Sequence, residues 1–393
     1  MINFQVSERD EKIFSMMREE SLIARKYARY YDTQEEHEMP PEVLPEGEDM
    51  PEARRDLIGQ RVIAEDGGLA VLHMGLTIER TWGDYAVEVR RSPGGLGNSA
   101  LQAAGSPEQI QRWGSLTLAM AITEPGCGSD PSALRTTATL DGDEWVINGE
   151  KIFVTLGVRA AGVVVWATVD SSAGRAGIKS FLIEKGTPGF NIVKKEKKLG
   201  IRAEDTAAYH FENCRIPREN LLGGDETVAK KGSGGFKGAM KTFNMTRPAV
   251  AALGLGISQA ALDFTKDELT KAGVELTYGG GAASENAIVK RFLELEALQE
   301  AAYLTVMRAA WLADEGQPNN LEASIAKAKG GQAVRLVTQG CIEILGPMGI
   351  SQEHLLEKWF RDCRIIDIYE GTGQIQHLII ARALMDYTRA DLS

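Results

Sequence analysis

Cysteine is scarce in this chain, and no cysteines or histidines have the spacing of a metal site. Only 4 cysteines occur among 393 residues, and Cys127, Cys214, Cys341 and Cys363 lie far apart. No two of them are separated by the two residues typical of zinc ligands. We therefore expect no bound metal, and reduced thiols of the kind found in the cytoplasm.

Long apolar runs, proline and positive charge are also in short supply. No run reaches the roughly 18 apolar residues that a membrane span needs. The N-terminal segment carries several acids and fits neither a signal peptide nor a transit peptide. The 44 Lys and Arg residues are outnumbered by 55 Asp and Glu, which argues against nucleic acid as the main partner. The 13 prolines and 42 glycines indicate many tight turns rather than a low-complexity chain.

Helical patterns frame a central β-rich region, which suits a chain long enough for two or three domains. Residues 7–31 carry apolar side chains at three- and four-residue spacing, and residues 53–81 predict a second helix, interrupted at Gly67-Gly68. Between residues 118 and 220, short β-rich runs alternate with turns, and Asn148-Gly149 predicts a hairpin turn. After residue 235, four alanine-rich helical segments suggest a bundle.

Two glycine-rich stretches invite different interpretations. Residues 95–100 match G-x-G-x-x-A, but a dinucleotide-binding loop needs a strand before it, and Arg-Arg-Ser-Pro precedes this one. A helix-breaking loop is the better interpretation. Residues 123–130, TEPGCGSD, place glycines beside hydroxyls, so that backbone amides can face an anion or a carbonyl oxygen. The alternative is an ordinary turn at the start of the β-rich region.

Glu370 stands out because it follows an apolar segment and comes just before a helix. Ile368 and Tyr369 make its surroundings apolar, which raises the pKa of a carboxyl and suits a general base. Gly371 leaves room for a ligand beside it. The alternative is an acid favoured by the dipole of the following helix, for which Thr372 is the expected N-cap.

Six blocks of sequence, taken together, resemble the acyl-CoA dehydrogenase family in order and spacing over residues 108–382. The blocks are TEPGCGSD, DGDEWVINGEKIFVT, FLIEKGTPGF, KKLGIRAEDTAAYHFENCRIPRENLLG, FNMTRP and RDCRIIDIYEGTGQIQHLIIAR. The resemblance implies an α+β, acyl-CoA dehydrogenase-like fold. Its parts would be an N-terminal helical domain (1–117), a middle antiparallel β-sheet domain (118–225) and a C-terminal four-helix bundle (226–393).

The resemblance also implies an oxidoreductase that uses FAD to desaturate an acyl-CoA thioester. Glu370 matches the base that removes the pro-R α-proton, while hydride leaves the β-carbon for flavin N5 and a trans-2-enoyl-CoA forms. Hydrogen bonds from the flavin ribityl 2′-hydroxyl and from the base residue's backbone N–H would polarise the carbonyl. The implied partners are the acyl-CoA substrate and an electron-transfer flavoprotein, in a homotetramer or, with a second chain, a hetero-oligomer.

Further positions match the family's binding residues. The implied FAD contacts are Met120, Ile122, Thr123, Gly128, Ser129, Phe153, Thr155, Gly346, Thr372 and Gln374. Phe153 takes an aromatic position where the family often has Trp, and Thr155 matches the hydroxyl that bonds flavin N5 and O4. The implied substrate contacts are Ser129, Phe243, Asn244, Arg247, Tyr369 and Gly371. Asn244 stands where the family commonly has Asp.

The FAD contacts that cross between subunits depart from the family pattern. Lys271 or Ala272 stands at the usual Arg, and Tyr278-Gly279 at the usual aromatic-Gly pair. Asn286 and Glu343 each replace a Gln, and Pro347 replaces a Gly. An unpaired Glu343 would repel the FAD phosphates. We therefore expect weaker binding, altered contacts, or a partner chain that supplies the missing groups.

The acyl-chain end is expected near GDYAVEVRRS, where a fatty-acyl pocket would be apolar. This segment instead carries Asp84, Glu88, Arg90 and Arg91. One interpretation assigns Glu88 and Arg91 to the substrate site, with Arg90 or Arg91 binding the second carboxylate of a dicarboxylyl-CoA. The alternative is a surface salt-bridge cluster with Asp84 and Glu88. Polar, branched and cyclic acyl groups also stay open.

Other functions occur on the same fold. An enoyl-CoA reductase or an acyl-CoA lyase would use the same ligand, whereas an oxidase usually has a longer chain. A partner subunit that completes FAD sites in another chain would explain the missing Arg but not Glu370. The last alternative is an acyl-CoA-binding protein that has lost FAD.

Overall fold

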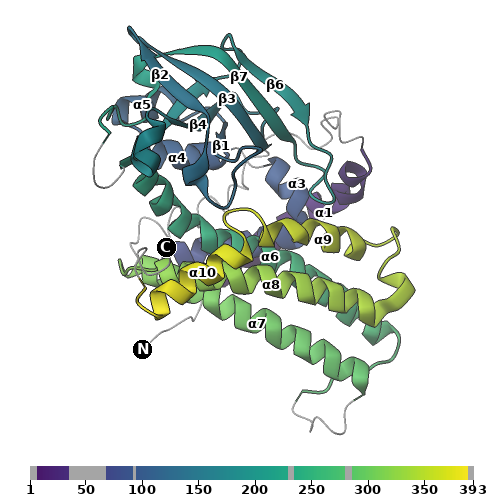
Figure 1. Ribbon diagram of the computed structural model, residues 1–393. Helices are drawn as coiled ribbons and strands as arrows, with labels where there is room; N and C mark the ends of the chain where they lie inside the picture. The colour runs from purple at the N-terminus through teal and green to yellow at the C-terminus, as the bar shows by residue number, and fades with distance from the viewer. Residues whose placement is uncertain (1–6, 35–67, 92–93, 229–233, 279–285, 388–393) are drawn as a thin grey trace.

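The structure is a computed structural model that describes residues 7–34, 68–91, 94–228, 234–278 and 286–387, with residues 234–245 described in their backbone only. A curved sheet lies against a group of long helices (Figure 1). Helices come first along the chain, then the strands, then the long helices. This order confirms the fold class expected from the sequence.

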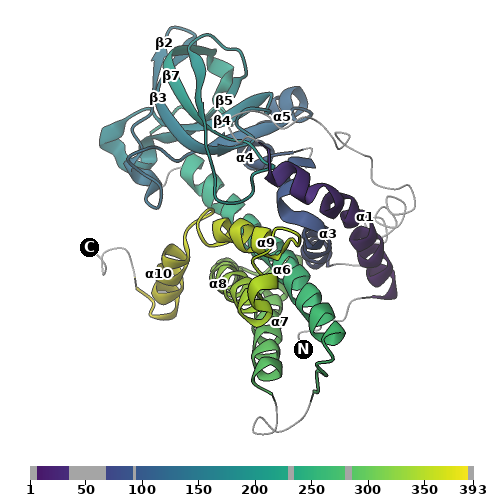
Figure 2. The ribbon, with the colours of Figure 1, turned by 90° about the vertical axis from the view of Figure 1, so that its right-hand side faces the viewer.

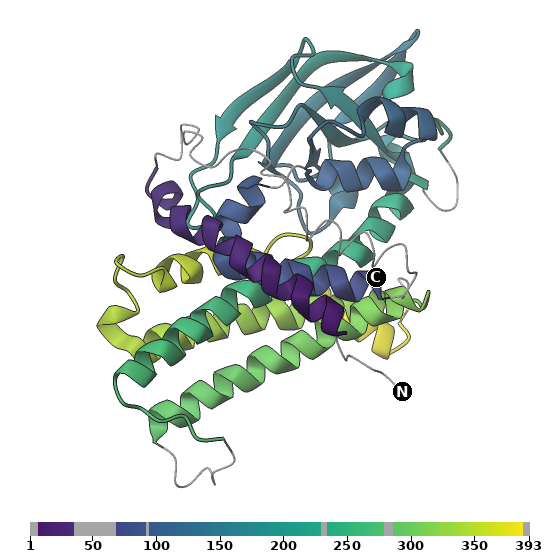
Figure 3. The same ribbon diagram turned by 180° about the vertical axis from the view of Figure 1, so that it is seen from behind.

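The helices before the sheet, in the described residues, are α1 (Glu8–Asp32), α3 (Leu69–Arg91), α4 (Leu96–Ala104) and α5 (Pro107–Trp113). α1 confirms the predicted first helix and begins after its N-cap Ser7, whose hydroxyl accepts a hydrogen bond from the Asp10 amide. The predicted second helix is described only from Leu69 onward, and residues 53–67 lie outside the described residues. Seen from behind, α1 lies along α3 (Figure 3).

Helix α3 is interrupted at Asp84, where the backbone is extended, with φ −162° and ψ 120°. The Asp84 carboxylate accepts a hydrogen bond from the Val87 amide, three residues on, at 3.0 Å. Asp84 therefore acts as an N-cap for the second half of α3. After the interruption, the Tyr85 hydroxyl is hydrogen bonded to that of Tyr369, and Arg90 donates to the carbonyl oxygen of Ala203.

The sheet has seven strands in the described residues: β1 (Leu118–Ala121), β2 (Thr137–Asp141), β3 (Glu144–Thr155), β4 (Gly162–Thr168), β5 (Ile178–Glu184), β6 (Phe190–Lys195) and β7 (Thr206–Pro217). The strand order is β1-β4-β2-β3-β7-β6, with β5 beside β4. Most pairs are antiparallel, as expected, while β4 runs parallel to β1 and β2. Short 3-10 turns lie at η1 (Pro131–Ala133), η2 (Ser171–Gly177) and η3 (Arg218–Asn220).

The prediction of a hairpin turn at Asn148-Gly149 is wrong. Both residues lie inside β3, and the turn that joins β2 to β3 is at residues 141–143, where Gly142 has φ +62°. Asp141-Gly142 is an equally strong turn signal. The chain turns there because β3 is then long enough to pair with β7. Gly149 instead forms a bulge with φ +146°, where a Cβ would lie 2.6 Å from Thr136 Oγ1.

The segment at residues 95–100 is not the helix-breaking loop expected from the sequence. Gly95 is the N-cap of α4, and the helix begins at the next residue. A Cβ at Gly95 would lie 2.3 Å from the carbonyl oxygen of Leu118, and one at Gly97 would lie 2.2 Å from that of Ala119. The glycines therefore let α4 pack directly on β1. The helix α3, and not a strand, precedes them, so the rejection of a dinucleotide-binding loop stands.

The C-terminal region contains α6 (Gly234–Lys271), α7 (Ala287–Asp314), α8 (Asn320–Leu345) and α10 (Gly373–Leu384), with η4 (Gly346–Met348), α9 (Leu356–Asp362) and η5 (Cys363–Asp367) between the last two. α6 and α8 pack closely, since a Cβ at Gly330 would lie 2.7 Å from that of Ala251. α10 packs on α8. The segment between α9 and α10 lies on the side of the bundle that faces the sheet (Figures 1 and 2).

Candidate active site

Glu370 lies in a strained turn between η5 and α10. Its φ is +57°, a left-handed value that is uncommon for a residue with a side chain, and Gly371 follows with φ +90°. The Gln376 side-chain amide donates hydrogen bonds to the carbonyl oxygens of Glu370 (3.2 Å) and Gly371 (3.1 Å). Thr372 caps α10, as expected, by accepting a hydrogen bond from the Ile375 amide. Strain that neighbouring groups hold in place is typical of functional sites.

The Glu370 carboxyl is half-buried between α6 and α8. The hydroxyl of Thr246, on α6, donates a hydrogen bond to Glu370 Oε2 at 2.8 Å. Burial raises the pKa of Glu370 above its usual range, and the Thr246 hydroxyl together with the positive charges of Arg247 and Lys327 partly offsets that rise. A carboxyl with a raised pKa that still ionises is suited to proton transfer.

Tyr369, next to Glu370, contacts the kinked helix α3. Its hydroxyl is hydrogen bonded to that of Tyr85 at 2.7 Å, one residue after the interruption at Asp84. Burial raises the pKa of both phenols, so both are neutral at ordinary pH. The segment expected to bind the acyl chain therefore touches the turn that carries Glu370.

Asp84 itself belongs to a buried ionic triad. Lys358 Nζ lies 2.7 Å from Asp84 Oδ2 and 2.5 Å from Asp362 Oδ2, and all three side chains are fully buried. The second oxygen of Asp362 accepts a hydrogen bond from the Ile201 amide, next to the sheet. The triad ties the kink of α3 to α9 and to the segment before β7.

The charged residues at the end of α3 are paired with protein groups. Glu88 accepts hydrogen bonds from Arg80 (2.6 Å) and Arg91 (2.8 Å). Arg90 is buried over the ring of Tyr31 and donates to the carbonyl oxygen of Ala203. This resembles the salt-bridge alternative, with two differences. The cluster is buried rather than on the surface, and Asp84 pairs with Lys358 instead of with an arginine.

The TEPGCGSD segment forms an exposed turn that a buried glutamate anchors. The Glu124 carboxylate accepts hydrogen bonds from Lys151 Nζ (2.7 Å), from the Thr136 hydroxyl (2.6 Å) and from the Arg135 amide (2.6 Å). Its backbone also pairs with that of Cys127. Within the described residues, the amides of Gly126, Gly128 and Ser129 donate no hydrogen bond to the protein. Exposed amides in a rigid turn can bind an anion such as a phosphate.

Phe153 lies at the end of β3 with 62% of its surface exposed and with φ +57°. The strand has a register shift between Lys151 and Val154, which turns this ring outward. Thr155, two residues on, is half-buried and carries a hydroxyl. An exposed ring for stacking, a hydroxyl and the donor-rich turn form a set of groups that fits FAD.

The other expected contacts are spread over several elements. Met120 and Ile122 are half-buried in and just after β1, and Gln374 is exposed on α10. Arg247 is buried beside Glu370, and burial lowers its pKa. Phe243 and Asn244 lie on α6, but their side chains lie outside the described residues.

The residues expected at the cross-subunit FAD site lie at the other end of the bundle, where α6 and α8 end and α7 begins. Thr246 and Lys271 are separated by about 37 Å of helix at 1.5 Å per residue. Lys271 is exposed and pairs with Glu268, while Asn286 caps α7. Gly346 ends α8 with φ +56°. Within one chain these residues do not meet Glu370.

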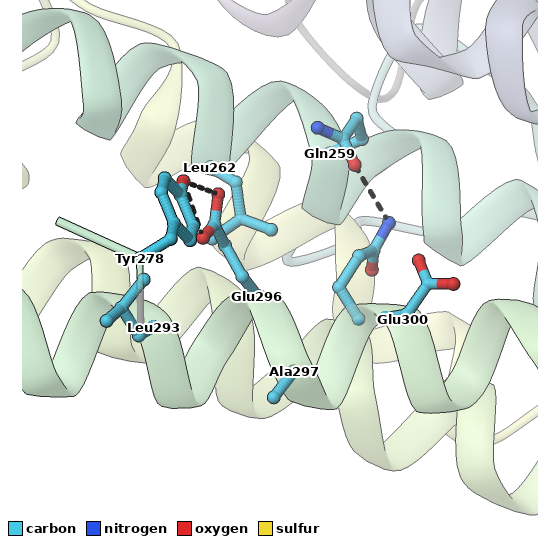
Figure 4. A pocket seen from close by; sticks show the side chains of 8 residues that line it. Gln259, Leu262, Tyr278, Leu293, Glu296, Ala297 and Glu300 are labelled. Carbon is cyan, nitrogen blue, oxygen red and sulfur yellow. Dashed lines mark hydrogen bonds between the residues drawn. The ribbon is translucent and has the colours of Figure 1, made fainter. Parts of the chain in front are cut away.

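Glu343 and Tyr278 already have partners at this end of the bundle. Glu343 lies 3.7 Å from Arg291, which counters the charge repulsion expected of an unpaired acid. Tyr278 bonds to Glu296 and lines a cavity of about 500 Å³ between α6 and α7 (Figure 4). Gly279 lies outside the described residues. None of the residues lining this cavity belongs to the Glu370 site.

Sequence reasoning missed three residues that contact or face Glu370. Thr246 lies beside Arg247 in the FNMTRP block, so that block could have identified it. Gln376 lies in the last block, six residues after Glu370. Lys327 is one of two lysines, with Lys329, in an alanine-rich helical segment, and nothing in its neighbourhood of the sequence distinguishes it.

Comparison with protein families gives two adjacent matches. The model described as acyl-CoA dehydrogenase, middle domain, matches residues 119–214, and that described as acyl-CoA dehydrogenase, C-terminal domain, matches residues 233–385. The short-chain specific acyl-CoA dehydrogenase from mitochondria of Rattus norvegicus is 40% identical over 287 residues, which are 72% of this chain and 67% of that protein.

Solved structures extend the similarity over nearly the whole chain. Butyryl-CoA dehydrogenase from Megasphaera elsdenii is 27% identical with a TM-score of 0.80, covering 98% of this chain and 100% of that one. A glutaryl-CoA dehydrogenase in complex with glutaryl-CoA is 26% identical with a TM-score of 0.81, covering 99% and 98%. This chain therefore belongs to the acyl-CoA dehydrogenase family of oxidoreductases that act on acyl-CoA.

Proposed function

We propose that this protein is an FAD-dependent enzyme that removes two hydrogens from an acyl-CoA thioester, with Glu370 as the base. The observation that carries the proposal is the position of the Glu370 carboxyl. It is held on a left-handed turn, is bonded to Thr246, and lies near two buried cations. The exposed Phe153 and the amides of the TEPGCGSD turn supply a separate surface for the cofactor.

In the proposed reaction the Glu370 carboxylate accepts the α-proton while hydride leaves the β-carbon, so that a trans-2-enoyl-CoA forms. The α-proton is very weakly acidic until hydrogen bonds polarise the thioester carbonyl. The backbone N–H of Glu370 is one donor we assign to that oxygen. Arg247 and Thr246 keep the carboxylate ionised and oriented before the proton moves.

A bound FAD would supply the electron acceptor for the hydride. We assign the flavin ring to Phe153 and Thr155, and the pyrophosphate to the amides of Gly128 and Ser129. Met120, Ile122, Thr123, Thr372 and Gln374 are the further cofactor contacts we propose. Lys271, Tyr278, Asn286, Glu343 and Gly346 are proposed to reach the FAD of a neighbouring subunit, because they lie far along the bundle from Glu370.

The acyl group we propose is short and either polar or dicarboxylic. Relatives of this chain include proteins described as short-chain, butyryl-CoA and glutaryl-CoA dehydrogenases. The buried Glu88 and Arg90 place charged groups at the end of α3, where a fatty-acyl pocket would be apolar. Arg91 is the group we assign to a second carboxylate, for which it would have to exchange its contact with Glu88. Phe243, Asn244 and Arg247 are assigned to the CoA arm.

We also propose the assembly that the family resemblance implies. The chain would divide near residues 117 and 225, form a homotetramer through its C-terminal helices, and pass electrons to an electron-transfer flavoprotein in the cytoplasm. Among the described residues, no helix is both long enough and apolar enough to cross a membrane.

A second candidate is a subunit that needs another chain to complete its FAD site. The observation in its favour is Lys271, which stands at the expected Arg and is exposed and paired with Glu268. Flavin content separates the two candidates. Purified alone, an enzyme of one chain type should contain about one FAD per chain, whereas the hetero-oligomer should bind FAD only with its partner.

The proposed activity is tested by adding a panel of CoA thioesters to the purified, FAD-loaded protein. Straight, branched, cyclic and dicarboxylic esters should be compared, with loss of flavin absorbance and formation of the enoyl-CoA as readouts. We expect at least one short ester to react. A protein that binds FAD but reacts with no ester, and exchanges no α-proton with D₂O, would contradict the proposal.

A further inference from the structure

Lys327 is a fully buried lysine for which the described part of the chain supplies no hydrogen-bond partner. It lies in the second turn of α8, its side chain is 0% exposed, and Nζ forms no hydrogen bond within the described residues. A buried ammonium group without a partner is costly, because its lost hydration is not replaced. A buried polar group of this kind in a folded protein therefore calls for a physical explanation.

The turn that carries Glu370 packs on the same face of α8 as Lys327. Gly331 lies one helical turn after Lys327, and residues at this spacing share a face. A Cβ at Gly331 would lie 3.0 Å from Asp367 Oδ1, and a Cβ at Gly373 would lie 2.6 Å from the same oxygen. The two glycines thus admit the Asp367 carboxylate between α8 and α10, three residues before Glu370.

The charged groups that face Lys327 come from each element packed around it. Asp367 ends η5, Glu370 precedes α10, and Arg247 belongs to α6. Neither carboxylate lies within ion-pair distance of Nζ among the described contacts. Burial lowers the pKa of Lys327 to about 8, against the effect of the two carboxylates, so the ammonium form predominates at neutral pH and below.

We propose that Lys327 is a positioning residue whose buried positive charge, placed beside Asp367 and Glu370, keeps the Glu370 carboxyl ionised for proton removal. The inference rests on the proposed role of Glu370 as the base. Arg247 contributes charge from the α6 side, and Lys327 contributes it from the α8 side. Removal of the lysine charge raises the pKa of Glu370, because a nearby cation favours the carboxylate.

The test compares Lys327→Met, Lys327→Gln and Lys327→Arg with the control Lys329→Met. Lys329 lies two residues along α8, which places it on a different face of the helix. Infrared difference spectra of each protein against its Glu370→Gln partner report the titration of the Glu370 carboxyl without any substrate. The pH profile of flavin reduction by an active thioester is the second readout.

We expect Lys327→Met and Lys327→Gln to move the Glu370 titration to higher pH. Below the wild-type midpoint, flavin reduction should slow by roughly threefold to tenfold, with little change in KM. Lys327→Arg should retain the wild-type profile, and Lys329→Met should not change it. The Met variant should unfold at or above the wild-type temperature, since it replaces an unpartnered charge with an apolar chain.

Two results would overturn the inference. One is a Glu370 titration at the wild-type pH in both neutral variants, and the other is a shift of the same size in Lys327→Arg. If one neutral variant fails to fold, the other and the Arg variant decide. Failure of the proposed function is a separate outcome, because the infrared titration can show the shift in a protein that reacts with no thioester.

Discussion

The hydroxyls of Tyr85 and Tyr369 are hydrogen bonded at 2.7 Å, although 284 residues separate them in the chain. Tyr85 follows the interruption in α3, and Tyr369 directly precedes Glu370. The contact joins the part of the chain expected to surround the acyl group to the part that carries the proposed base. Changes at either side should therefore affect the reaction. Five substitutions, beside this contact and elsewhere in the chain, allow specific predictions.

Glu370→Gln should abolish α-proton removal and leave the fold intact. The amide has the size of the carboxyl but cannot accept a proton, and a positioned base contributes roughly 10²- to 10⁴-fold in rate. Single-turnover flavin reduction should fall by at least that factor, while FAD content and CoA binding stay near those of the wild type. Near-wild-type turnover would place the base elsewhere.

Thr246→Val should change the pH dependence of the reaction. The Thr246 hydroxyl donates to Glu370 and lowers the pKa of its carboxyl, so its removal raises that pKa. The rate should fall at acidic pH and recover as the pH rises and Glu370 ionises. Flavin reduction measured from acidic to alkaline pH checks this, with Thr246→Ser as the control that keeps the hydroxyl. A uniform loss at every pH would argue against this role.

Phe153→Ala should weaken FAD binding without weakening the fold. The ring is 62% exposed, so its loss should change the free energy of unfolding by less than about 0.5 kcal/mol. Aromatic stacking is worth about 0.5–1.5 kcal/mol, which predicts a rise in the FAD Kd of roughly twofold to twelvefold. Fluorescence titration of the apoprotein measures this. Leu199→Ala, at an equally exposed side chain, should leave the Kd unchanged.

Gly371→Ala should destabilise the turn that carries Glu370. The φ of +90° is strained for alanine, and its Cβ would lie 2.5 Å from Gln376 Nε2. A cost of about 1–3 kcal/mol is expected for the backbone conformation, with a further loss of activity if Gln376 moves. Denaturant unfolding and single-turnover rates measure the two effects. Gly273→Ala separates them, because Gly273 has a similar φ of +75° but nothing near its Cβ position.

Glu204→Gln should make the protein less sensitive to alkaline pH. Burial raises the pKa of Glu204 to about 8, despite the contact with Arg159 at 2.6 Å. The folded state therefore holds a proton that the unfolded state releases near pH 4.5, so stability falls as pH rises from there to about 8. Unfolding free energies measured across this range should show a shallower fall in the variant.

Two features make the Glu204→Gln experiment straightforward to interpret. Arg159 keeps a second carboxylate partner in Asp205 at 2.7 Å, so the glutamine does not leave a buried guanidinium alone. Glu196→Gln serves as the control, because Glu196 also precedes β7 and pairs with Lys194. It should keep the wild-type slope of unfolding free energy against pH. Parallel pH profiles for Glu204→Gln and the wild type would contradict the prediction.

Much of the fold could be predicted from the sequence because local and long-range signals agree there. Apolar spacing defines α1, and alanine-rich composition defines α6 to α8. The error at Asn148-Gly149 arose where two turn signals compete within a few residues. Pairing of β3 with β7, which lies much further along the chain, decided between them, and a local pattern cannot report such a partner.

The site was predicted less completely than the fold. Glu370 and Arg247 lie in distinctive blocks, so the sequence alone was enough to assign their neighbourhood. Asp84, at the kink of α3, pairs with Lys358, and Lys327 contributes to the environment of Glu370. Both lysines lie in ordinary helical sequence. Their importance comes from burial, which a helix pattern does not reveal for a long charged side chain.

The triad of Asp84, Lys358 and Asp362 sets a rule for engineering substrate choice. Asp84 and Lys358 are 274 positions apart, yet neither charge is solvated. A chimera whose α3 lacks a carboxylate at position 84, while keeping its own α9, would leave Lys358 with Asp362 as its one carboxylate partner in the triad and would remove the N-cap of the second half of α3. Loss of such a cap costs about 0.5–2 kcal/mol. Successful grafts should therefore exchange the two segments as a matched pair.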